Sequence, residues 1–249
     1  MIRTLLVLLL ALAAAAAPKA GRPLKTPFSP GEVISFSVGW GLINAGSSSL
    51  SVLDTARVQG HLCWRIQSQA QSNEVLSKLY PVRDRVVTWM DVKGLFSRAL
   101  SKNLSEGSYK KQRDYQIMPE RGLVVKRKNG QPVDTLRIRG PVQDVLSAFY
   151  WVRTQPLAVG QVLEVEAVDD LKAYRLAIKV LAREKVKVKA GEFDCFKIQP
   201  ILLGEGLFKA KGEVFIWVTA DERRIPVKMK SKIFIGAISA GMVSYTPGR

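Results

Sequence analysis

Histidine and cysteine are scarce: the 249-residue chain has one histidine, His61, and two cysteines, Cys63 and Cys195. A Ser-His-Asp or Cys-His catalytic arrangement would therefore need His61 as its base. Because His61 follows Gly60 at the start of an expected strand, we interpret it as an exposed loop residue. Zinc sites need three or four clustered Cys, His or carboxylate ligands. The sequence therefore predicts no catalytic residue, no metal site and no cofactor.

The two cysteines leave two alternatives open. Disulfides persist in oxidising compartments, so Cys63 and Cys195 are a candidate disulfide. The bond needs Cα atoms within about 7 Å of each other, which depends on the fold. The alternative is two separate buried thiols, because a free cysteine behaves as a small hydrophobic residue.

Long hydrophobic runs are also missing. The longest near the N-terminus, Leu5 to Ala17, has 13 residues, whereas a membrane-spanning helix needs about 20. Arg3 before this run and the small residues Ala15-x-Ala17 at its end predict a signal peptide over residues 1–17. The alternative is a short N-terminal anchor that stays uncleaved. A signal peptide predicts export to the periplasm or beyond and no transmembrane span in the mature chain.

Acidic residues are few relative to basic ones: 38 Lys and Arg against 21 Asp and Glu give a formal net charge of +17. Such an excess fits nucleic acid, but export argues against that partner. Anionic partners outside the cytoplasm are phospholipid headgroups, lipopolysaccharide phosphates and acidic polysaccharides. The alternative is a general solubilising excess without a specific partner. The candidate anionic-binding surface consists of two lysine rows: Lys185, Lys187 and Lys189, and Lys228, Lys230 and Lys232.

These lysine rows belong to a chain that alternates apolar and polar residues along most of its length, which is typical of half-buried antiparallel strands. One helix is expected, from Asp144 to Arg153, with Asp144 as its N-cap. A tight turn is expected at Asn129-Gly130. We therefore expect a mostly β protein, a large curved antiparallel sheet or open barrel built from two similar β meanders, with the helix packed on it.

The two meanders follow from an apparent internal repeat. Gly31-Glu32-Val33 resembles Gly160-Gln161-Val162, and the segments around Cys63 and Cys195 resemble each other in the same order. We expect a signal peptide (1–17), an extended leader (18–30) and one β-rich domain (31–249). Its pseudo-repeats cover about residues 31–117 and 160–245, linked by a hairpin and the helix 144–153.

Other short patterns predict turns rather than chemistry. Neighbouring residues of a strand point to opposite faces, so the adjacent carboxylates Asp169-Asp170 are not expected to act together in acid–base chemistry. We interpret them as a turn, and Asp221-Glu222-Arg223-Arg224 as a charged hairpin turn. Gly204-Glu205-Gly206 lacks the helix and lysine of a phosphate-binding loop, and Gly39-Trp40-Gly41 lies between two expected strands, so both are interpreted as turns or bulges. The five tryptophans are interpreted as core residues rather than as the lining of a ligand groove.

Several of these segments together resemble the exported bacterial family of unknown function DUF3108, over nearly the whole mature chain. They are Pro27-Phe28-x-x-Gly31-Glu32, Trp40-Gly41-x-Ile43-x-Ala45-Gly46, Asp144–Arg153, Gly191-Glu192-Phe193-Asp194-Cys195 and Trp217–Val227. The resemblance implies an exported, mostly β protein. It implies no activity and transfers no functional residue.

Three functions remain open on the sequence. The first is a non-catalytic periplasmic protein that binds an apolar ligand or an envelope partner on a concave β face. The second is electrostatic attachment of the lysine rows to an anionic lipopolysaccharide, lipid or polysaccharide. The third is an enzyme, of hydrolase type, whose Cys nucleophile or carboxylate pair assembles only in three dimensions. An open apolar interior would favour a lipid carrier, and a filled interior would favour a scaffold.

Overall fold

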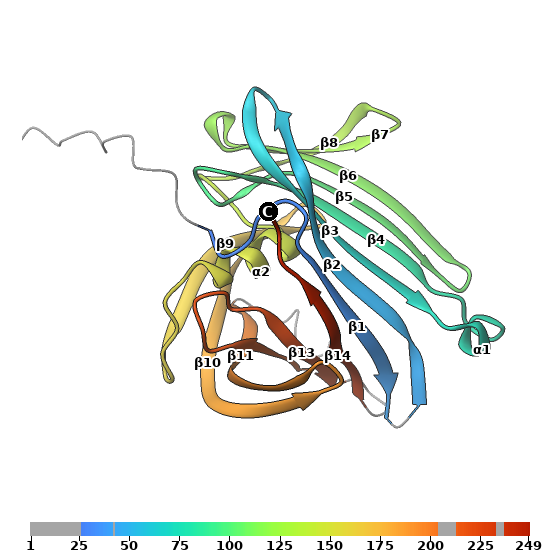
Figure 1. Ribbon diagram of the computed structural model, residues 1–249. Coiled ribbons are helices and arrows are strands. Elements are labelled where there is room, and N and C mark those ends of the chain that lie inside the picture. The colour runs from blue at the N-terminus through green and yellow to red at the C-terminus, as the bar shows by residue number, and fades with distance from the viewer. Residues whose placement is uncertain (1–25, 42, 204–212, 233–236) are drawn as a thin grey trace, which may run out of the picture.

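The computed structural model describes residues 26–41, 43–203, 213–232 and 237–249. The strands in these residues form one antiparallel sheet in the order β8-β7-β6-β5-β4-β3-β2-β1-β14-β13-β12-β11-β10-β9 (Figure 1). The predicted mostly β fold, a large curved antiparallel sheet with a central helix, is confirmed. The strands are β1 (Val33–Trp40), β2 (Ile43–Val58), β3 (His61–Ser72), β4 (Arg83–Asp91), β5 (Ser97–Glu106), β6 (Tyr109–Met118), β7 (Leu123–Lys128), β8 (Gln131–Arg137), β9 (Val162–Asp169), β10 (Lys172–Val188), β11 (Gly191–Leu203), β12 (Val214–Thr219), β13 (Pro226–Lys232) and β14 (Ala237–Thr246).

Alternation along the strands decides which side chains are buried, as the sequence predicts. In β1, Ile34 and Phe36 are fully buried, while Ser35 and Ser37, which alternate with them, remain half-exposed. Successive side chains of a strand point to opposite faces, so one face of the sheet carries the core and the other carries small polar residues.

The sheet curls until the edge formed by β9 and β10 meets β5 and β6, which lie near the opposite edge. The turn between β9 and β10 contacts β5 and β6 through ion pairs of Asp169 with Lys102 and of Asp170 with Lys111. Asp170 also accepts a hydrogen bond of 2.7 Å from the Tyr115 hydroxyl. The predicted Asp169-Asp170 turn is thus confirmed, and its carboxylates hold the two ends of the curl together.

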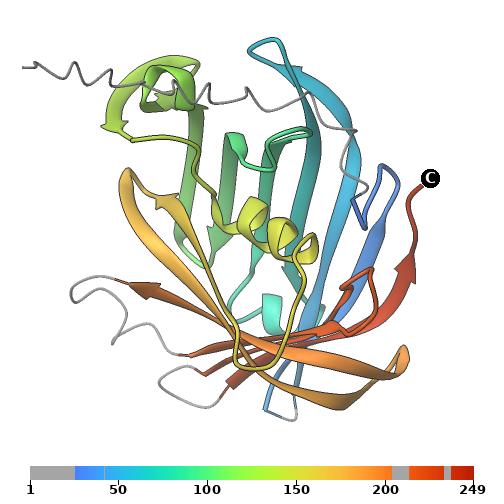
Figure 2. The same ribbon diagram turned by 90° about the vertical axis from the view of Figure 1, so that its left-hand side faces the viewer.

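The central helix α2 (Val145–Arg153) lies inside the curl, where it contacts β3, β4 and β9 (Figure 2). Its predicted N-cap is confirmed: Asp144 accepts bonds from the amides of Leu146 and Ser147, and the Ser147 hydroxyl accepts a bond from the Asp144 amide. Asp144 also accepts a 2.5 Å bond from Thr88 on β4, which fixes the helix start to the sheet. Two short helices, α1 (Glu74–Ser77) and η1 (Pro119–Arg121), and strand β8 were not expected from the sequence.

The other end of α2 is held by an ion pair that lies entirely in the interior. Arg153 donates two hydrogen bonds to the Glu32 carboxylate, at 2.6 and 2.8 Å, and both side chains are at most 1% exposed. The guanidinium also lies over the rings of Phe28 and Tyr150, at 5.3 and 5.0 Å. Although burial opposes it, the hydrogen bonds and charge of Glu32 raise the pKa of Arg153, so the guanidinium stays charged.

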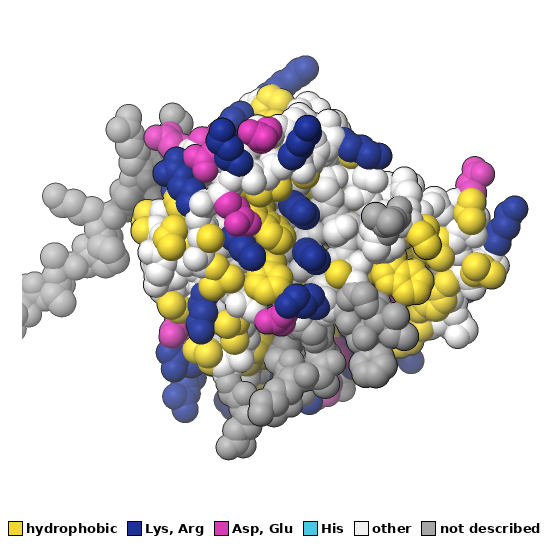
Figure 3. Space-filling model, turned by 90° about the horizontal axis from the view of Figure 1, so that it is seen from below, with side chains coloured by type: hydrophobic (Ala, Val, Ile, Leu, Met, Phe, Trp, Pro, Cys, Tyr) yellow, Lys and Arg dark blue, Asp and Glu magenta, His cyan; other side chains and the backbone are white. Residues whose placement is uncertain are grey.

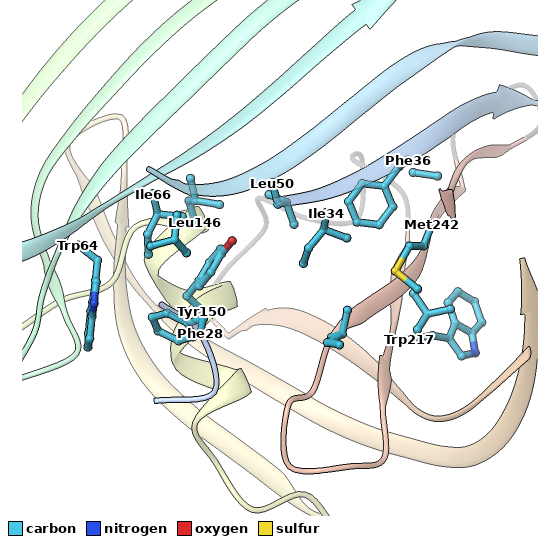
Figure 4. Close-up of a cluster of buried hydrophobic side chains, with 14 of the residues drawn as sticks. Phe28, Ile34, Phe36, Leu50, Trp64, Ile66, Leu146, Tyr150, Trp217 and Met242 are labelled. Atoms are coloured by element: carbon cyan, nitrogen blue, oxygen red, sulfur yellow. The ribbon is translucent and has the colours of Figure 1, made fainter. Parts of the chain in front are cut away.

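Hydrophobic side chains from α2 and both halves of the sheet fill the curl around this pair (Figure 4). The rings of Phe28 and Tyr150 meet edge-to-face with centroids 4.9 Å apart. In the described part of the leader, Phe28 is thus packed into the core. Trp64 and Trp217 are core residues as expected, but Trp40 is 46% exposed.

The sheet supports the predicted internal repeat, because β1–β6 and β9–β14 are both six-strand meanders. Two β-bulges of the first meander have counterparts in the second, whereas the bulge in β1–β2 has none in β9–β10. Leu53 and Leu181 are skipped in the pairings β2–β3 and β10–β11, an offset of 181 − 53 = 128 residues. Arg98 and Val227 are skipped in β4–β5 and β12–β13, an offset of 227 − 98 = 129 residues. That one repeated unit underlies both halves stays a proposal.

Parts of the sequence predictions lie outside the described residues, namely the signal peptide 1–17 and Gly204-Glu205-Gly206. The predicted tight turn at Asn129-Gly130 is confirmed, with positive φ angles of 50° and 77°. None of the helices in the described part of the chain is long and apolar enough to cross a membrane.

The buried pair generates the first testable prediction. Arg153→Met leaves the Glu32 carboxylate buried without a partner, which we expect to lower the free energy of unfolding by about 3–5 kcal/mol. The double variant Glu32→Leu/Arg153→Met removes both charges and should recover most of that loss. Urea denaturation of the three proteins measures both effects.

The matched control is Glu164→Gln in the exposed pair of Arg175 and Glu164, whose side chains are 60% and 42% exposed. Solvent screening should limit its cost to about 1 kcal/mol or less. An Arg153→Met loss as small as that of the control would contradict an anchoring role for the buried pair.

Candidate functional site

A trough of about 420 Å³ lies across β1, β2, β3 and β4 and is bordered by β14. Ser35 on β1 and Ser47 and Ser49 on β2 line its floor; Ser49 pairs with Ser35, and Ser47 pairs with Ser37. Ile34 and Phe36, the neighbours of Ser35 along β1, belong to the core. The serines therefore point to the outer face of the sheet, away from α2.

Longer polar side chains form one wall of this serine trough. Gln71 on β3 and Arg83 on β4 continue the same row of paired residues as Ser47. Gln69 and Arg85 continue the neighbouring row, next to Ser49. Small serines beside long glutamine and arginine side chains leave a depression, so the trough follows directly from the sequence and the strand register.

This wall presents hydrogen-bond donors to solvent. The Gln71 amide reaches Ser47 only at 3.4 Å, and Arg85 is held by Gln67 at 2.6 Å. Within the described residues, Arg83 has no ion-pair partner within 4 Å and is exposed. Hydroxyl, amide and guanidinium groups suit a polar, negatively charged ligand rather than an acyl chain.

The opposite border of the trough lies beside the tip of the β10–β11 hairpin. This tip folds over the outer face of β14, because the Ala190 amide donates to the Met242 carbonyl at 3.1 Å. Val188 lies against Gly241, where an added Cβ would be 3.4 Å from a Val188 methyl group. The next residue after Met242, Val243, lines the trough. Lys187 and Lys189 are therefore exposed beside its border.

The two predicted lysine rows differ in their surroundings. Lys185, Lys187 and Lys189 are exposed on the hairpin tip, and Lys185 is 3.7 Å from Glu192. In the second row, Lys228 and Lys230 are half-buried rather than fully solvated. The Lys228 ammonium lies 5.3 Å from the centre of the Trp217 ring, and Lys232 pairs with Glu213 at 2.5 Å. Only in the first row are all three lysines, Lys185, Lys187 and Lys189, exposed to solvent.

His61 belongs to a charged cluster at the opposite end of the strands. Arg98, which the β4–β5 bulge turns inward, donates to Asp91 at 2.9 Å, to Glu120 at 2.6 Å and lies 3.2 Å from the His61 ring. Although burial opposes it, hydrogen bonds from the Gly94 amide and Arg98 hold the pKa of Asp91 below its usual value. The arginine neutralises both carboxylates, so the cluster stabilises a turn and offers His61 no nucleophile to activate.

The two cysteines are free and buried, so the candidate disulfide is not formed. Although they lie at equivalent places in the two halves, β3 and β11 are six strand positions apart in the sheet. Burial and the Asp91 carboxylate raise the pKa of Cys63 to about 11. Burial and nearby carboxylates raise the pKa of Cys195 to about 12. Neither thiol is ionised at neutral pH, as a nucleophile would need to be.

Among the described residues, no group of three His, Cys, Asp or Glu side chains is arranged to hold a metal ion. The serine trough was missed by sequence reasoning, because its residues come from separate strands. The signal that was present is the run Ser47-Ser48-Ser49 opposite Ser35 and Ser37.

The family model for DUF3108, a protein family of unknown function, matches residues 35–243. The chain therefore belongs to the DUF3108 family, as the resemblance of its motifs indicated. No curated protein matches the sequence.

Solved structures show a related fold. A β-barrel-like protein of the DUF1849 family from Brucella abortus is similar with a TM-score of 0.57 at 9% identity, over 87% of this chain and 97% of that one. A DUF1089 protein from Pseudomonas aeruginosa (TM-score 0.39, 15% identity, 76% and 90% coverage) is a more remote match. So is a candidate exported protein with a YmcC-like fold from Bacteroides fragilis (TM-score 0.32, 9% identity, 89% and 98% coverage). The first of these supports the fold and carries no function over to this chain.

The thiols give the second prediction. We expect Ellman's reagent to titrate no thiol in the native protein at mildly alkaline pH, and both cysteines after unfolding in denaturant, because burial keeps both protonated and inaccessible. Rapid reaction of either cysteine in the native state would contradict this environment. A protein mass two hydrogens short of the reduced chain would instead reveal a disulfide.

Proposed function

We propose that the chain is an exported, non-catalytic protein of the cell envelope that binds an anionic, hydroxyl-rich polymer in the serine trough. The observation that carries this proposal is the trough itself, with its serine floor and donor-rich wall. Sugar chains bearing carboxylate or phosphate groups match such a surface, because hydroxyls pair with serine and amide groups while anions pair with arginine and lysine.

The filled interior supports an outer site. In the described residues, α2 and the buried clusters around it occupy the concave face that an apolar ligand would need. The small void lined by Leu100, Tyr115 and Val168 holds only about 10 Å³, about the space of one water molecule. These observations favour a scaffold with a surface ligand over a carrier of enclosed lipid.

Charge on both sides of the trough supports the same class of ligand. Arg83 and Arg85 lie on β4, and the tip lysines Lys187 and Lys189 lie beyond β14. From β4 to β14 is four strand positions, or about 19 Å along the sheet. An extended polyanion of several sugar units can therefore reach cations at both borders while its hydroxyls rest on the serines.

The third prediction tests both borders together. We expect the protein to bind a heparin-derived hexasaccharide and to bind neutral chitohexaose weakly or not at all. The double variant Arg83→Glu/Lys189→Glu should weaken hexasaccharide binding about 10-fold at low salt, since it reverses one charge at each border. Isothermal titration calorimetry at low and physiological salt measures these affinities.

The matched control is Lys126→Glu/Lys128→Glu on β7, which makes the same change in net charge at the far side of the sheet. It should retain most of the affinity. Equal loss in both variants would mean that only the overall charge matters, and would contradict a site in the trough.

A further inference from the structure

Exposed apolar side chains gather at one end of the strands. Of the 15 large hydrophobic residues that are exposed in the described part of the chain, seven lie there, and we call them the apolar rim: Trp40, Ile43, Val75, Leu79, Tyr80, Tyr109 and Ile238. Figure 3 shows hydrophobic side chains gathered on the side of the molecule where Figure 1 places α1. Single exposed hydrophobic residues are ordinary, whereas a cluster marks an interaction surface.

Contacts between the segments make the rim continuous. Trp40 pairs with Ile238 on β14 and with Ile43 on β2. The side-chain amide of Asn73, which precedes α1, donates to the Asn44 carbonyl at 2.6 Å. Tyr80, beyond α1, lies against the β5–β6 turn at Gly107, two residues before Tyr109. The rim therefore runs from β14 through β1, β2 and α1 to β6.

The exposure of α1 shows that this surface does not serve the chain's own core. The helix has no buried residue. Val75 within it is 75% exposed, and Leu79, two residues beyond its end, is 84% exposed. Its N-cap, Asn73, accepts a 2.8 Å bond from Leu76, so the turn is well formed. A short capped helix that presents aliphatic side chains to solvent is suited to an apolar medium outside the protein.

Cations accompany the rim. Lys78 at the end of α1 and Lys110 next to Tyr109 are exposed, and within the described residues neither has an ion-pair partner within 4 Å. Three acids lie near the rim. Glu213 pairs with Lys232, and burial, a hydrogen bond to Asp84 and the charge of Asp84 raise the pKa of Glu106. Glu74 in the first turn of α1 is exposed. The net charge of +17 makes two copies of the chain repel each other and attracts an anionic surface.

We propose that the apolar rim docks the protein on the surface of a phospholipid bilayer with anionic headgroups. Aromatic rings of Trp and Tyr favour the headgroup region, aliphatic side chains insert just below it, and lysines pair with lipid phosphates. The rim is separate from the serine trough, so this inference stands independently of the proposed polymer binding.

Vesicle binding tests the proposal, using the purified full chain with vesicles of phosphatidylcholine alone or mixed with phosphatidylglycerol. We expect binding to the mixed vesicles, weakened by salt, and little binding to the neutral ones. Ile43→Ser/Leu79→Ser should reduce partitioning about 10-fold. The matched control Val133→Ser/Val159→Ser changes residues that are 53% and 57% exposed elsewhere, and should bind like the wild type.

Trp40 provides an independent readout, because it is 46% exposed whereas Trp64 and Trp217 are 7% exposed. Brominated lipids should quench its emission in the wild type, and the quenching should be absent in Trp40→Phe. Unchanged vesicle binding by the rim variant would overturn the proposal and assign the binding to another segment, such as the N-terminal apolar run. Equal binding to neutral vesicles, or a lipid-free dimer that the rim variant dissociates, would overturn it as well.

Discussion

The ion pair between Arg153 and Glu32 is the interaction on which the arrangement of the whole molecule depends. It joins the end of α2 to the segment before β1, and Arg153 also donates to the Arg223 carbonyl at 3.3 Å in the β12–β13 turn. A guanidinium and a carboxylate that are both removed from water must remain paired, since either one alone would be strongly destabilising. The helix is therefore fixed where both halves of the sheet meet.

Because of this constraint, the concave face of the sheet differs in its role from the outer face and the strand ends. With α2 and the leader residue Phe28 inside the curl, the concave face serves packing. The two proposed binding surfaces lie elsewhere: the serine trough is on the outer face, and the apolar rim is at the strand ends. Cations border both surfaces, so under the two proposals part of the large positive charge would serve binding.

Local pattern was sufficient to predict much of the fold. The alternation of Val186 with Lys185 and Lys187, the cap at Asp144 and the turn at Asn129-Gly130 all depend on neighbours in the sequence, and each is present in the structure. The role of His61 as an exposed residue near a strand start was also predictable, although its link to Arg98 was not.

Features that depend on contacts distant in sequence were not predictable. Glu32 and Arg153 are 121 residues apart, and no local sequence pattern around either residue identifies the other as its partner. Equivalent places in a repeat suggested a bond between Cys63 and Cys195, but equivalent strands of this sheet are far apart. The serine trough exists only once the strand register aligns β1 to β4, which no single segment of the sequence specifies.

Hydrogen exchange of the α2 amides, followed by mass spectrometry in the native protein, tests the central claim most directly. If the buried pair fixes α2 inside the curl, peptides from residues 145–153 should exchange as slowly as those from β1 and β2, through global unfolding alone. Exchange of α2 that is much faster than that of these strands would show that the helix leaves the concave face. The interior would then be open to a ligand, which would contradict a concave face that the buried pair keeps filled.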